Sequence, residues 1–366
     1  MKKITLVFGT RPDAVKMCPL ALELKSRADR LETRVVVTGQ HREMLYQVME
    51  PFGVVPEHDL SIMTQGQTLF EITERVLDGM KAELTAHRPD VLLVHGDTST
   101  AFASALAAFY MQIPIGHVEA GLRTYNLASP YPEEFNRQAV DLVSRFFFAP
   151  TQASRENLIA EGKPDDAVFV TGNTEIDALR YTVRDDYSHA ELDWAAGSRL
   201  ALMTAHRREN LGDTMRGIFT AVRRVLDENP DVKIIYPVHL NPAVQSAAQE
   251  TLRNHPRVHL INPLGVADFH NFIARSHLVL TDSGGIQESA PALGKPVLVL
   301  RDTTERPEGV AAGTLLLAGT GEAEVYREFT RLLGDSALYK KMSDAENPYG
   351  DGFASKRIAD ILESAL

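Results

Sequence analysis

The sequence predicts an α/β fold built from two doubly wound domains, and three observations lead to this prediction. The chain has 366 residues, which at roughly 150 residues per domain corresponds to two domains. Short apolar runs alternate with stretches of helical period, as expected of parallel strands covered by helices on both faces. The predicted strands are also too numerous for one open sheet of usual size.

The expected strands are short and rich in Val, Ile, Leu and Phe, and they fall into two sets. The first set is Ile4–Phe8, Arg34–Thr38, Val91–His95, Ile113–His117, Phe146–Ala149 and Val168–Thr171. The second set is Leu200–Thr204, Lys233–Tyr236, Val258–Ile261, Leu278–Thr281, Pro296–Leu300 and Thr314–Leu317. The intervening helical periods include Leu69–Ala86, Thr100–Tyr110, Met215–Asp227 and Gly285–Leu293.

A polar segment without a strand pattern, Tyr181–Ser198, separates the two sets and predicts a helix followed by a linker. We therefore expect a first Rossmann-like domain over residues 1–172 and a second over residues 173–351, facing a cleft. Residues 352–366 carry apolar side chains at helical spacing and predict a closing helix.

Composition excludes several classes of protein. The net charge of −11 repels nucleic acid and anionic lipid, and an aromatic fraction of 7% argues against a base-stacking surface. The apolar runs are too short to span a bilayer, and no signal-like segment opens the chain. The single cysteine, Cys18, rules out an internal disulfide and a zinc site built on cysteines. These features indicate a cytoplasmic protein without a membrane partner.

In open α/β sheets ligands bind beyond the carboxyl ends of the strands, so the residues after each strand matter most. After the first strand, Gly9 allows a tight turn and Pro12 suits the first position of a helix. Arg11 and Lys16 would then lie near a helix N-terminus, which favours anions. A capped helix with surface cations explains the same segment equally well.

Carboxylates follow two later strands and open a helix. Asp97, Glu119 and Glu133 are expected in one cleft, where neighbouring carboxylates shift one another's pKa and can serve as acid and base. The alternatives are a helix N-cap for Asp97 and a first-turn glutamate for Glu133. His95 and His117, each two residues before a carboxylate, could ligate a metal with His206 and His239. Buried histidines at strand ends explain them better, so no metal is predicted.

In the second half, Ser283-Gly284-Gly285 stands between a strand and a helix, where backbone amides can bind an anion. With His206, Arg207 and the segment 301–307 it predicts a diphosphate pocket. Arg207, Arg208 and Arg301 could instead pair with neighbouring acids. No Gly-x-Gly-x-x-Gly follows any strand, so a dinucleotide cofactor is not indicated.

Taken together, these motifs resemble those of the bacterial non-hydrolysing UDP-N-acetylglucosamine 2-epimerases, in order and over nearly the whole chain. They are Phe8-Gly9-Thr10-Arg11-Pro12, His95-Gly96-Asp97-Thr98, Gly116 to Arg123, Tyr131-Pro132-Glu133-Glu134, Gly172-Asn173-Thr174, His206-Arg207-Arg208-Glu209, Asp282 to Glu288 and Arg301 to Pro307. The resemblance implies the glycosyltransferase-B fold, with the closing helix crossing back to the first domain, and a homodimer.

The resemblance also implies the reaction. UDP-N-acetylglucosamine and UDP-N-acetylmannosamine interconvert by elimination of UDP to a 2-acetamidoglucal and its re-addition, with no metal or other cofactor, for cell-envelope polysaccharide. Asp97, Glu119 and Glu133 match the catalytic carboxylates, and His206 is included with them. The implied substrate and UDP contacts are Arg11, Lys16, His206, Arg207, His239, Leu264 through its backbone, Phe269, Ser283, Gly284, Gly285, Ser289 and Arg306.

The sequence departs from the family pattern at two places. Ser289 stands where the family has a glutamate on the ribose hydroxyls, so we expect nucleotide binding weaker by about 1–3 kcal/mol if that bond is not otherwise made. At a second, activating site, Gln40, Glu133, Arg207 and His239 match the pattern, whereas Glu43 and Gly66 replace a glutamine and an arginine. A hydrolysing 2-epimerase, a glycosyltransferase of the same fold and a nucleotide-sugar-binding regulator remain as alternatives.

Overall fold

The computed structural model describes residues 1–39, 42–64 and 66–366, and for residues 42–44 it describes the backbone alone. The chain divides into two compact units. The first unit contains Met1–Tyr181 and Tyr349–Leu366, and the second contains Thr182–Pro348. Both boundaries differ from the expected 172/173 and 351/352.

The physical reason is the attachment of helix α7 (Thr174–Thr182) to the first unit. Its Asp177 accepts hydrogen bonds from the backbone N–H groups of Ala354 (3.1 Å) and Ser355 (2.7 Å), which open α16 (Ala354–Ala365). Just before α7, the Asn173 N–H donates to the carbonyl of Tyr349 at 2.7 Å. Helices α7 and α16 are therefore bound to each other within the first unit. The chain leaves this unit after Tyr181, near the end of α7, and returns to it at Tyr349, before α16 begins.

The described residues of the first unit form a seven-stranded parallel sheet in the order β3-β2-β1-β4-β5-β6-β7. The strands are β1 (Lys2–Phe8), β2 (Leu31–Val37), β3 (His58–Asp59), β4 (Val91–His95), β5 (Ile115–Val118), β6 (Phe146–Ala149) and β7 (Val168–Val170). The helices besides α7 and α16 are α1 (Arg11–Lys25), α2 (Arg42–Met49), α3 (Leu69–Ala86), α4 (Ser99–Tyr110), α5 (Glu133–Val143) and α6 (Gln152–Ala160).

The second unit repeats this plan with six parallel strands in the order β10-β9-β8-β11-β12-β13. The strands are β8 (Arg199–Thr204), β9 (Val232–Pro237), β10 (Val258–Ile261), β11 (Leu278–Thr281), β12 (Val297–Val299) and β13 (Leu315–Leu317). The helices are α8 (Ala190–Ala195), α9 (Asp213–Glu228), α10 (Pro242–Leu252), α11 (Val266–Arg275), α12 (Gly284–Ala292), α13 (Pro307–Ala312), α14 (Glu322–Gly334) and α15 (Ser336–Ser343).

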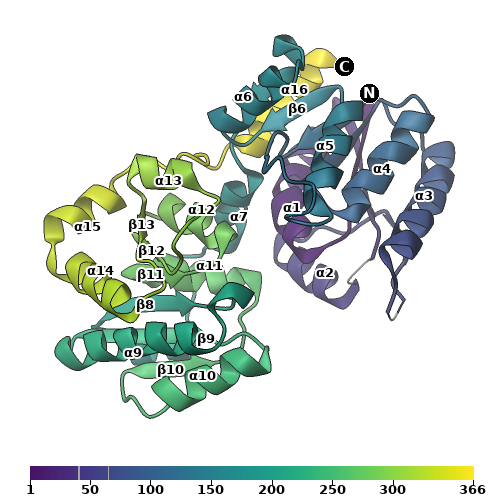
Figure 1. Cartoon of the computed structure of the whole chain (residues 1–366). Helices are drawn as coiled ribbons and strands as arrows, with labels where there is room; N and C mark the ends of the chain where they lie inside the picture. Colours follow the sequence, from purple (N-terminus) through teal and green to yellow (C-terminus); the bar gives the residue numbers. More distant parts are fainter. Residues whose placement is uncertain (40–41, 65) are drawn as a thin grey trace. The chain divides into compact units, whose positions relative to one another are not determined.

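Helices lie on both faces of each sheet (Figure 1), so the α/β, doubly wound prediction is confirmed. The strand β3 was not predicted, because its two residues, His58 and Asp59, form no apolar run. In both sheets the strand order reverses beside the first strand of the unit, between β1 and β4 and between β8 and β11. This reversal is the place where ligands bind in doubly wound sheets.

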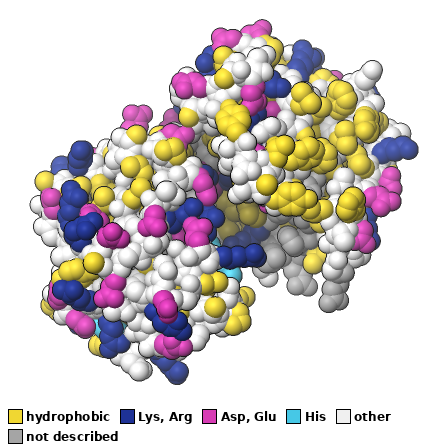
Figure 2. Space-filling model, viewed as in Figure 1, with side chains coloured by type: hydrophobic (Ala, Val, Ile, Leu, Met, Phe, Trp, Pro, Cys, Tyr) yellow, Lys and Arg dark blue, Asp and Glu magenta, His cyan; other side chains and the backbone are white. Residues whose placement is uncertain are grey.

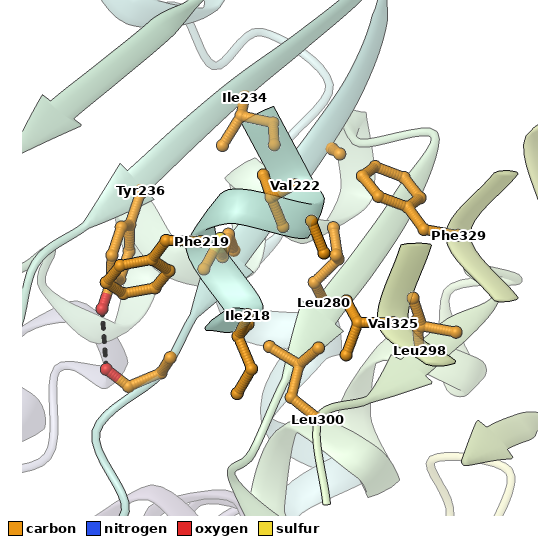
Figure 3. Close-up of a cluster of buried hydrophobic side chains, with 14 of the residues drawn as sticks. Ile218, Phe219, Val222, Ile234, Tyr236, Leu280, Leu298, Leu300, Val325 and Phe329 are labelled. Carbon is orange, nitrogen blue, oxygen red and sulfur yellow. Dashed lines mark hydrogen bonds between the residues drawn. The ribbon is translucent and has the colours of Figure 1, made fainter. Parts of the chain in front are cut away.

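The core of the second unit holds the loop after β8 in place. Ile218, Phe219 and Val222 of α9 pack against strands β9, β11 and β12 and against α14 (Figure 3). Within this cluster the Tyr236 hydroxyl donates a hydrogen bond of 2.7 Å to the carbonyl of Ala205. A buried hydroxyl needs such a partner, and here the partner is the residue before His206. The core therefore fixes the backbone from which His206 and Arg207 project.

Candidate active site

Glu119 follows β5 directly and adopts a left-handed backbone conformation with φ of +69°. For a residue other than glycine this conformation is strained, and strained residues persist where the surroundings hold them. The Glu119 N–H donates to the carbonyl of Phe148 in β6 at 3.1 Å. The side chain is 11% exposed. Its Oε2 accepts hydrogen bonds from Lys16 Nζ and from Asn173 Nδ2, the latter at 3.0 Å.

The electrostatic surroundings keep Glu119 ionised. Burial raises the pKa of this carboxyl, but the positive charges of Lys16 and His95 outweigh burial and hold the pKa well below its ordinary value. Among the described residues, every hydrogen bond to Glu119 uses Oε2. Oε1 therefore has no hydrogen-bond donor among these residues.

Asp97 follows the end of β4 by two residues and lies against α5. Its Oδ2 accepts from Nη2 and from Nε of Arg137, the second at 3.1 Å, and its carbonyl accepts from Asn136 Nδ2 at 2.9 Å. The side chain is 26% exposed. The alternative role for Asp97 as a helix cap is wrong, because Thr98 caps α4 and accepts from the Ala101 N–H.

The two glutamates that open α5 differ in their surroundings. Glu134 is fully buried and accepts from the N–H groups of Thr124 (3.0 Å) and Tyr125 (2.9 Å), so it closes the preceding loop. Glu133 is half-buried and makes no hydrogen bond or ion pair with the described residues. It lies one turn before Arg137, the residue that holds Asp97. Glu133 is thus both a first-turn glutamate and a carboxylate that can meet a ligand.

The histidines at the end of β4 and within β5 are buried residues with protein partners. His95 Nδ1 lies 3.1 Å from Asp13 Oδ1. His117 places Nδ1 2.6 Å from Asp141 Oδ1 and Nε2 2.8 Å from the carbonyl of Gly96. In the parts of the chain that the structure describes, no group of three or more His, Cys, Asp or Glu side chains is arranged to hold a metal ion.

The turn after β1 contains a tight turn at Gly9 and a capped helix start. Gly9 is required there, since an added Cβ would lie 2.1 Å from Thr38 Oγ1. Thr10 caps α1, and Asp13 completes the capping box by accepting from the Thr10 N–H. Arg11 is exposed at the first position of the helix. Lys16, which the resemblance places among the substrate contacts, forms an ion pair with Glu119 and lies 3.8 Å from Glu175.

In the second unit, Asp282 joins the loops that follow β8 and β11. It is fully buried, and its Oδ2 accepts from the N–H groups of His206 and Arg207, both at 2.8 Å. His206 Nδ1 lies 3.3 Å from Asp282 Oδ1. The sequence placed Asp282 in a motif but did not predict that its carboxylate orients the His206 loop.

His206 is suited to proton transfer at neutral pH. Its ring stacks on that of His239, with centroids 5.4 Å apart. Burial lowers the pKa of His206. The charge of Asp282 opposes this effect and that of Arg207 adds to it, leaving the pKa below its ordinary value. The ring is therefore mostly neutral near pH 7. His239 itself is exposed and accepts from the Asn241 N–H at 3.1 Å.

The N-terminus of α12, where the sequence predicts an anion site, opens on two glycines. Ser283 occupies the N-cap position without a side-chain cap, so Gly284 and Gly285 open the helix with their amides. A Cβ at Gly284 would lie 3.7 Å from Nη2 of Arg306, so this guanidinium stands beside the helix start. Arg306 Nε also donates to Glu288 Oε1. Backbone amides and a guanidinium together suit a phosphate.

Two other arginines of this unit pair with acids, as the alternative interpretation held. Arg207 lies 3.6 Å from Glu305, and the buried Arg301 lies 3.1 Å from Glu209 and 3.4 Å from Glu305. The Arg207–Glu305 pair is partly exposed, and pairs of this kind are weak, so it can yield to an anionic ligand.

The remaining implied contacts of the second unit lie around α11 and α12. Leu264 and Phe269 are half-buried and pack, with Ile286 of α12, against one hydrophobic cluster. Ser289 is 2% exposed, and its hydroxyl donates to the carbonyl of Gly285 at 3.2 Å. The Ser289 hydroxyl is therefore already hydrogen-bonded to the backbone of α12.

The residues of the implied activating site are described only in part. Gln40 lies outside the described residues, and the side chain of Glu43 in α2 is not described. Gly66 is exposed with φ of +72°, and nothing lies within 4 Å of an added Cβ. Glu133 belongs to the first unit, and Arg207 and His239 belong to the second.

Sequence reasoning missed Asp13, Arg137 and Asn173 as partners of the candidate residues. The Thr10-x-x-Asp13 spacing of a capping box could have indicated Asp13. Arg137 lies one helical turn after Glu133, but nothing in the sequence links it to Asp97.

These features define a class: an α/β protein of two doubly wound units, with buried ionisable side chains at the strand ends of one unit and a glycine-opened helix beside an arginine in the other. A family model described as UDP-N-acetylglucosamine 2-epimerase matches residues 23–363. The UDP-N-acetylglucosamine 2-epimerase of Bacillus subtilis (strain 168) is 57% identical over 360 residues, covering 98% of this chain and 94% of that protein. This chain belongs to the UDP-N-acetylglucosamine 2-epimerase family.

Solved structures agree with this assignment. The S. aureus MnaA–UDP co-structure matches with a TM-score of 0.91 and 51% identity, covering 99% of this chain and 96% of that one. The Neisseria meningitidis UDP-GlcNAc 2-epimerase bound to UDP-GlcNAc matches with a TM-score of 0.89 and 46% identity, covering 99% of this chain and 100% of that one. The fold is thus of the glycosyltransferase-B type that the sequence predicted. None of the helices in the described part of the chain has the length and apolar character to cross a membrane.

Proposed function

We propose that this protein is a non-hydrolysing epimerase that interconverts UDP-N-acetylglucosamine and UDP-N-acetylmannosamine. The observation that carries the proposal is Glu119, a largely buried carboxylate held ionised beside Lys16 and His95 at the strand ends of the first unit. Because it is ionised, this carboxylate can accept a proton as a general base. No cofactor is needed for this reaction.

The proposed reaction has two balanced halves. A base removes the C2 proton, a C1=C2 double bond forms, and the C1–O bond breaks so that UDP leaves with the electron pair. UDP then adds back at C1 while an acid delivers a proton to C2 from the opposite face. Asp97, Glu119 and Glu133 are the proposed acid–base groups, and the neutral His206 is a further proton carrier.

The second unit supplies the proposed UDP contacts. The amides of Gly284 and Gly285 and the guanidinium of Arg306 suit the diphosphate. Leu264 and Phe269 are proposed beside the base. Arg306 is paired with Glu288 in this structure, so phosphate binding would exchange one negative partner for another.

The experiment that tests the function is incubation with UDP-N-acetylglucosamine in deuterated water, followed by proton NMR. We expect UDP-linked N-acetylmannosamine carrying deuterium at C2. Free N-acetylmannosamine with UDP as the first product would identify a hydrolysing 2-epimerase instead. Transfer of the sugar to an added acceptor would identify a glycosyltransferase, and C2 left unlabelled after turnover would contradict proton abstraction.

We also propose that the protein is a homodimer that associates through α4 and α5. Helix α4 carries no charged residue, and it is apolar on its outer side as well as on its core side. Figure 2 shows hydrophobic side chains gathered over these helices. The exposed members include Phe109, Phe135 and Leu142. An uncharged face suits a second copy of itself, because it brings no like charges together.

Light scattering tests the dimer. Leu142→Glu places a charge on this face and should shift the mass towards a single chain of 40.4 kDa. The control is Val55→Glu, at an apolar position that is 72% exposed in another part of the first unit. A dimer that survives the Leu142 variant would locate the interface elsewhere.

We further propose that the protein works in the cytoplasm. Its only cysteine is buried, and burial raises the pKa of the Cys18 thiol to about 12, which suits a chain that keeps a reduced thiol. Cell fractionation tests this location.

A further inference from the structure

Two side chains from separate elements form a buried row with the proposed catalytic carboxylate, Glu119. Asp13 of α1, His95 at the end of β4 and Glu119 after β5 have side chains that are 5%, 4% and 11% exposed. Asp13 Oδ1 lies 3.1 Å from His95 Nδ1, and His95 Nε2 lies 3.7 Å from Glu119 Oε2. The imidazole ring therefore stands between the two carboxylates.

Asp13 is itself held firmly in place. Its Oδ2 accepts from the Thr10 hydroxyl at 2.8 Å and from the Thr98 hydroxyl at 3.4 Å, so it joins the start of α1 to the cap of α4. With Oδ2 used in this way, Oδ1 is directed at His95. The contact fixes which ring nitrogen faces Asp13 and leaves Nε2 directed towards Glu119.

His95 Nε2 is buried and has no hydrogen-bond partner among the described residues. A buried polar group without a bond is costly, whereas a buried cation beside a carboxylate is compensated. Burial lowers the pKa of His95, but the charge of Glu119 and the hydrogen bond to Asp13 outweigh burial and raise it to about 9. At neutral pH the ring is therefore a cation with two carboxylate neighbours.

We propose that Asp13 and His95 are positioning residues for Glu119. Asp13 orients the imidazolium of His95, and this imidazolium holds the Glu119 carboxylate ionised, with Oε2 facing the ring and Oε1 directed away from the ring. The inference rests on the proposed epimerase function and assigns residues that are not among its acid–base groups. The other charged groups around Glu119 are Lys16, which contacts it, and Glu175, which lies 3.8 Å from Lys16. Asp97 follows His95 by two residues and is held by Arg137.

The first experiment measures the pH dependence of kcat for the wild type and for His95→Gln. Loss of a cation within 4–6 Å of a carboxylate raises its pKa by about 1–3 units, so the acidic limb of kcat should move to higher pH by that amount. Misplacement of Glu119 should also lower kcat at its optimum by about 10²-fold, with KM little changed. An acidic limb that stays in place would overturn the proposal, even if kcat falls.

The matched control is His58→Gln. His58 also pairs with a buried carboxylate of the first unit, Glu83, at 2.5 Å. If the effect of His95→Gln came from general loosening of the unit, His58→Gln would reproduce it. We expect the control to leave the acidic limb in place, and a shift of equal size in the control would count against positioning by His95.

The second experiment does not need turnover, so it separates failure of this inference from failure of the proposed function. Protein with ¹⁵N-labelled histidine is titrated by NMR, and the His95 signals are assigned by their loss in His95→Gln. We expect His95 to remain an imidazolium well above pH 7 and to lose its proton at lower pH in Asp13→Asn and in Glu119→Gln. A wild-type His95 that titrates near its ordinary value of 6.5, or that ignores both substitutions, would overturn the proposal.

Discussion

The substitution Asp141→Asn tests how the backbone that presents Glu119 is held. Asp141 is fully buried in α5 and accepts from His117 Nδ1 (2.6 Å), Arg123 Nη2 (2.7 Å) and the Gly121 N–H (3.3 Å). His117 precedes Glu119 by two residues, and Gly121 follows it by two. An asparagine offers one oxygen and turns its NH₂ towards either His117 or Arg123, both of which are donors.

The magnitude follows from these contacts. Breaking a buried ion pair by removing one partner costs about 3–5 kcal/mol, because a charge is left uncompensated. Arg123 keeps its bonds to Glu161, both at 2.7 Å, so we expect the lower part of this range. A loss of about 3 kcal/mol is a large share of the 5–15 kcal/mol that a typical protein has in total.

Urea unfolding followed by circular dichroism measures this loss. The single tryptophan, Trp194, belongs to the second unit, so its fluorescence reports that unit while circular dichroism reports both. We expect the circular dichroism transition to move to lower urea and the fluorescence transition to move less. Asp29→Asn is the control, since Asp29 is exposed and lies 3.4 Å from the exposed Arg30. Surface pairs of this kind contribute about 0–1 kcal/mol.

The same residue gives a pH prediction. Burial raises the pKa of Asp141, but His117 and Arg123 outweigh burial and lower it below the ordinary value of 3.8. A lowered folded-state pKa means stability that is present above pH 3.8 and is lost as the pH falls through the folded pKa. Asp141→Asn should remove this part of the acid sensitivity. Unchanged stability in the variant at neutral pH, together with unchanged acid unfolding, would refute the reasoning.

Three further predictions concern the proposed activity. Asp97→Asn, Glu119→Gln and Glu133→Gln should each lower turnover by about 10²–10⁴-fold with an unchanged circular dichroism spectrum, and near-normal turnover in one variant would make that residue structural. Arg306→Ala should weaken UDP binding by calorimetry by about 1.5–3 kcal/mol, the value of a hydrogen bond to a charged group, and unchanged affinity would remove Arg306 from the phosphate site. Ser289→Ala should leave UDP affinity unchanged, because the helix already uses the Ser289 hydroxyl, whereas weaker binding would show that serine contacts ribose.

Replacing Ser289 with glutamate restores the residue of the family pattern and should tighten UDP binding, but the structure indicates a cost in stability. Ser289 is 2% exposed, and larger side chains at packed positions cost about 1–3 kcal/mol in stability. Calorimetry of UDP binding should therefore be accompanied by a measurement of unfolding for Ser289→Glu. Glu288 is not a simple substitute, because it is 2% exposed and accepts from Arg306.

Much of the fold could be predicted, because buried parallel strands leave a clear signal in the sequence. The bounds of β4, β6, β10 and β11 agree with the predicted runs. The edge strand β3 was missed, because its two residues are half-buried and a pattern that relies on burial does not detect them. The unit boundary was also misplaced, since the attachment of α7 depends on hydrogen bonds from residues 354 and 355, far away in the sequence.

The candidate site divides in the same way between what a local pattern can reveal and what only the folded chain determines. The strand pattern was sufficient to predict that Asp97 and Glu119 follow neighbouring strands, because parallel strands bring their carboxyl ends to one edge. Partners were not predictable: Lys16 pairs with a residue 103 positions away, and His95 contacts a residue 82 positions away. A lysine near a helix start can pair with a phosphate or with a carboxylate. The sequence pattern therefore places the positive charge of Lys16 but does not predict its partner. The ionisation state of Glu119 depends on those partners, and the chemistry of this site is therefore set by long-range contacts that no local motif contains.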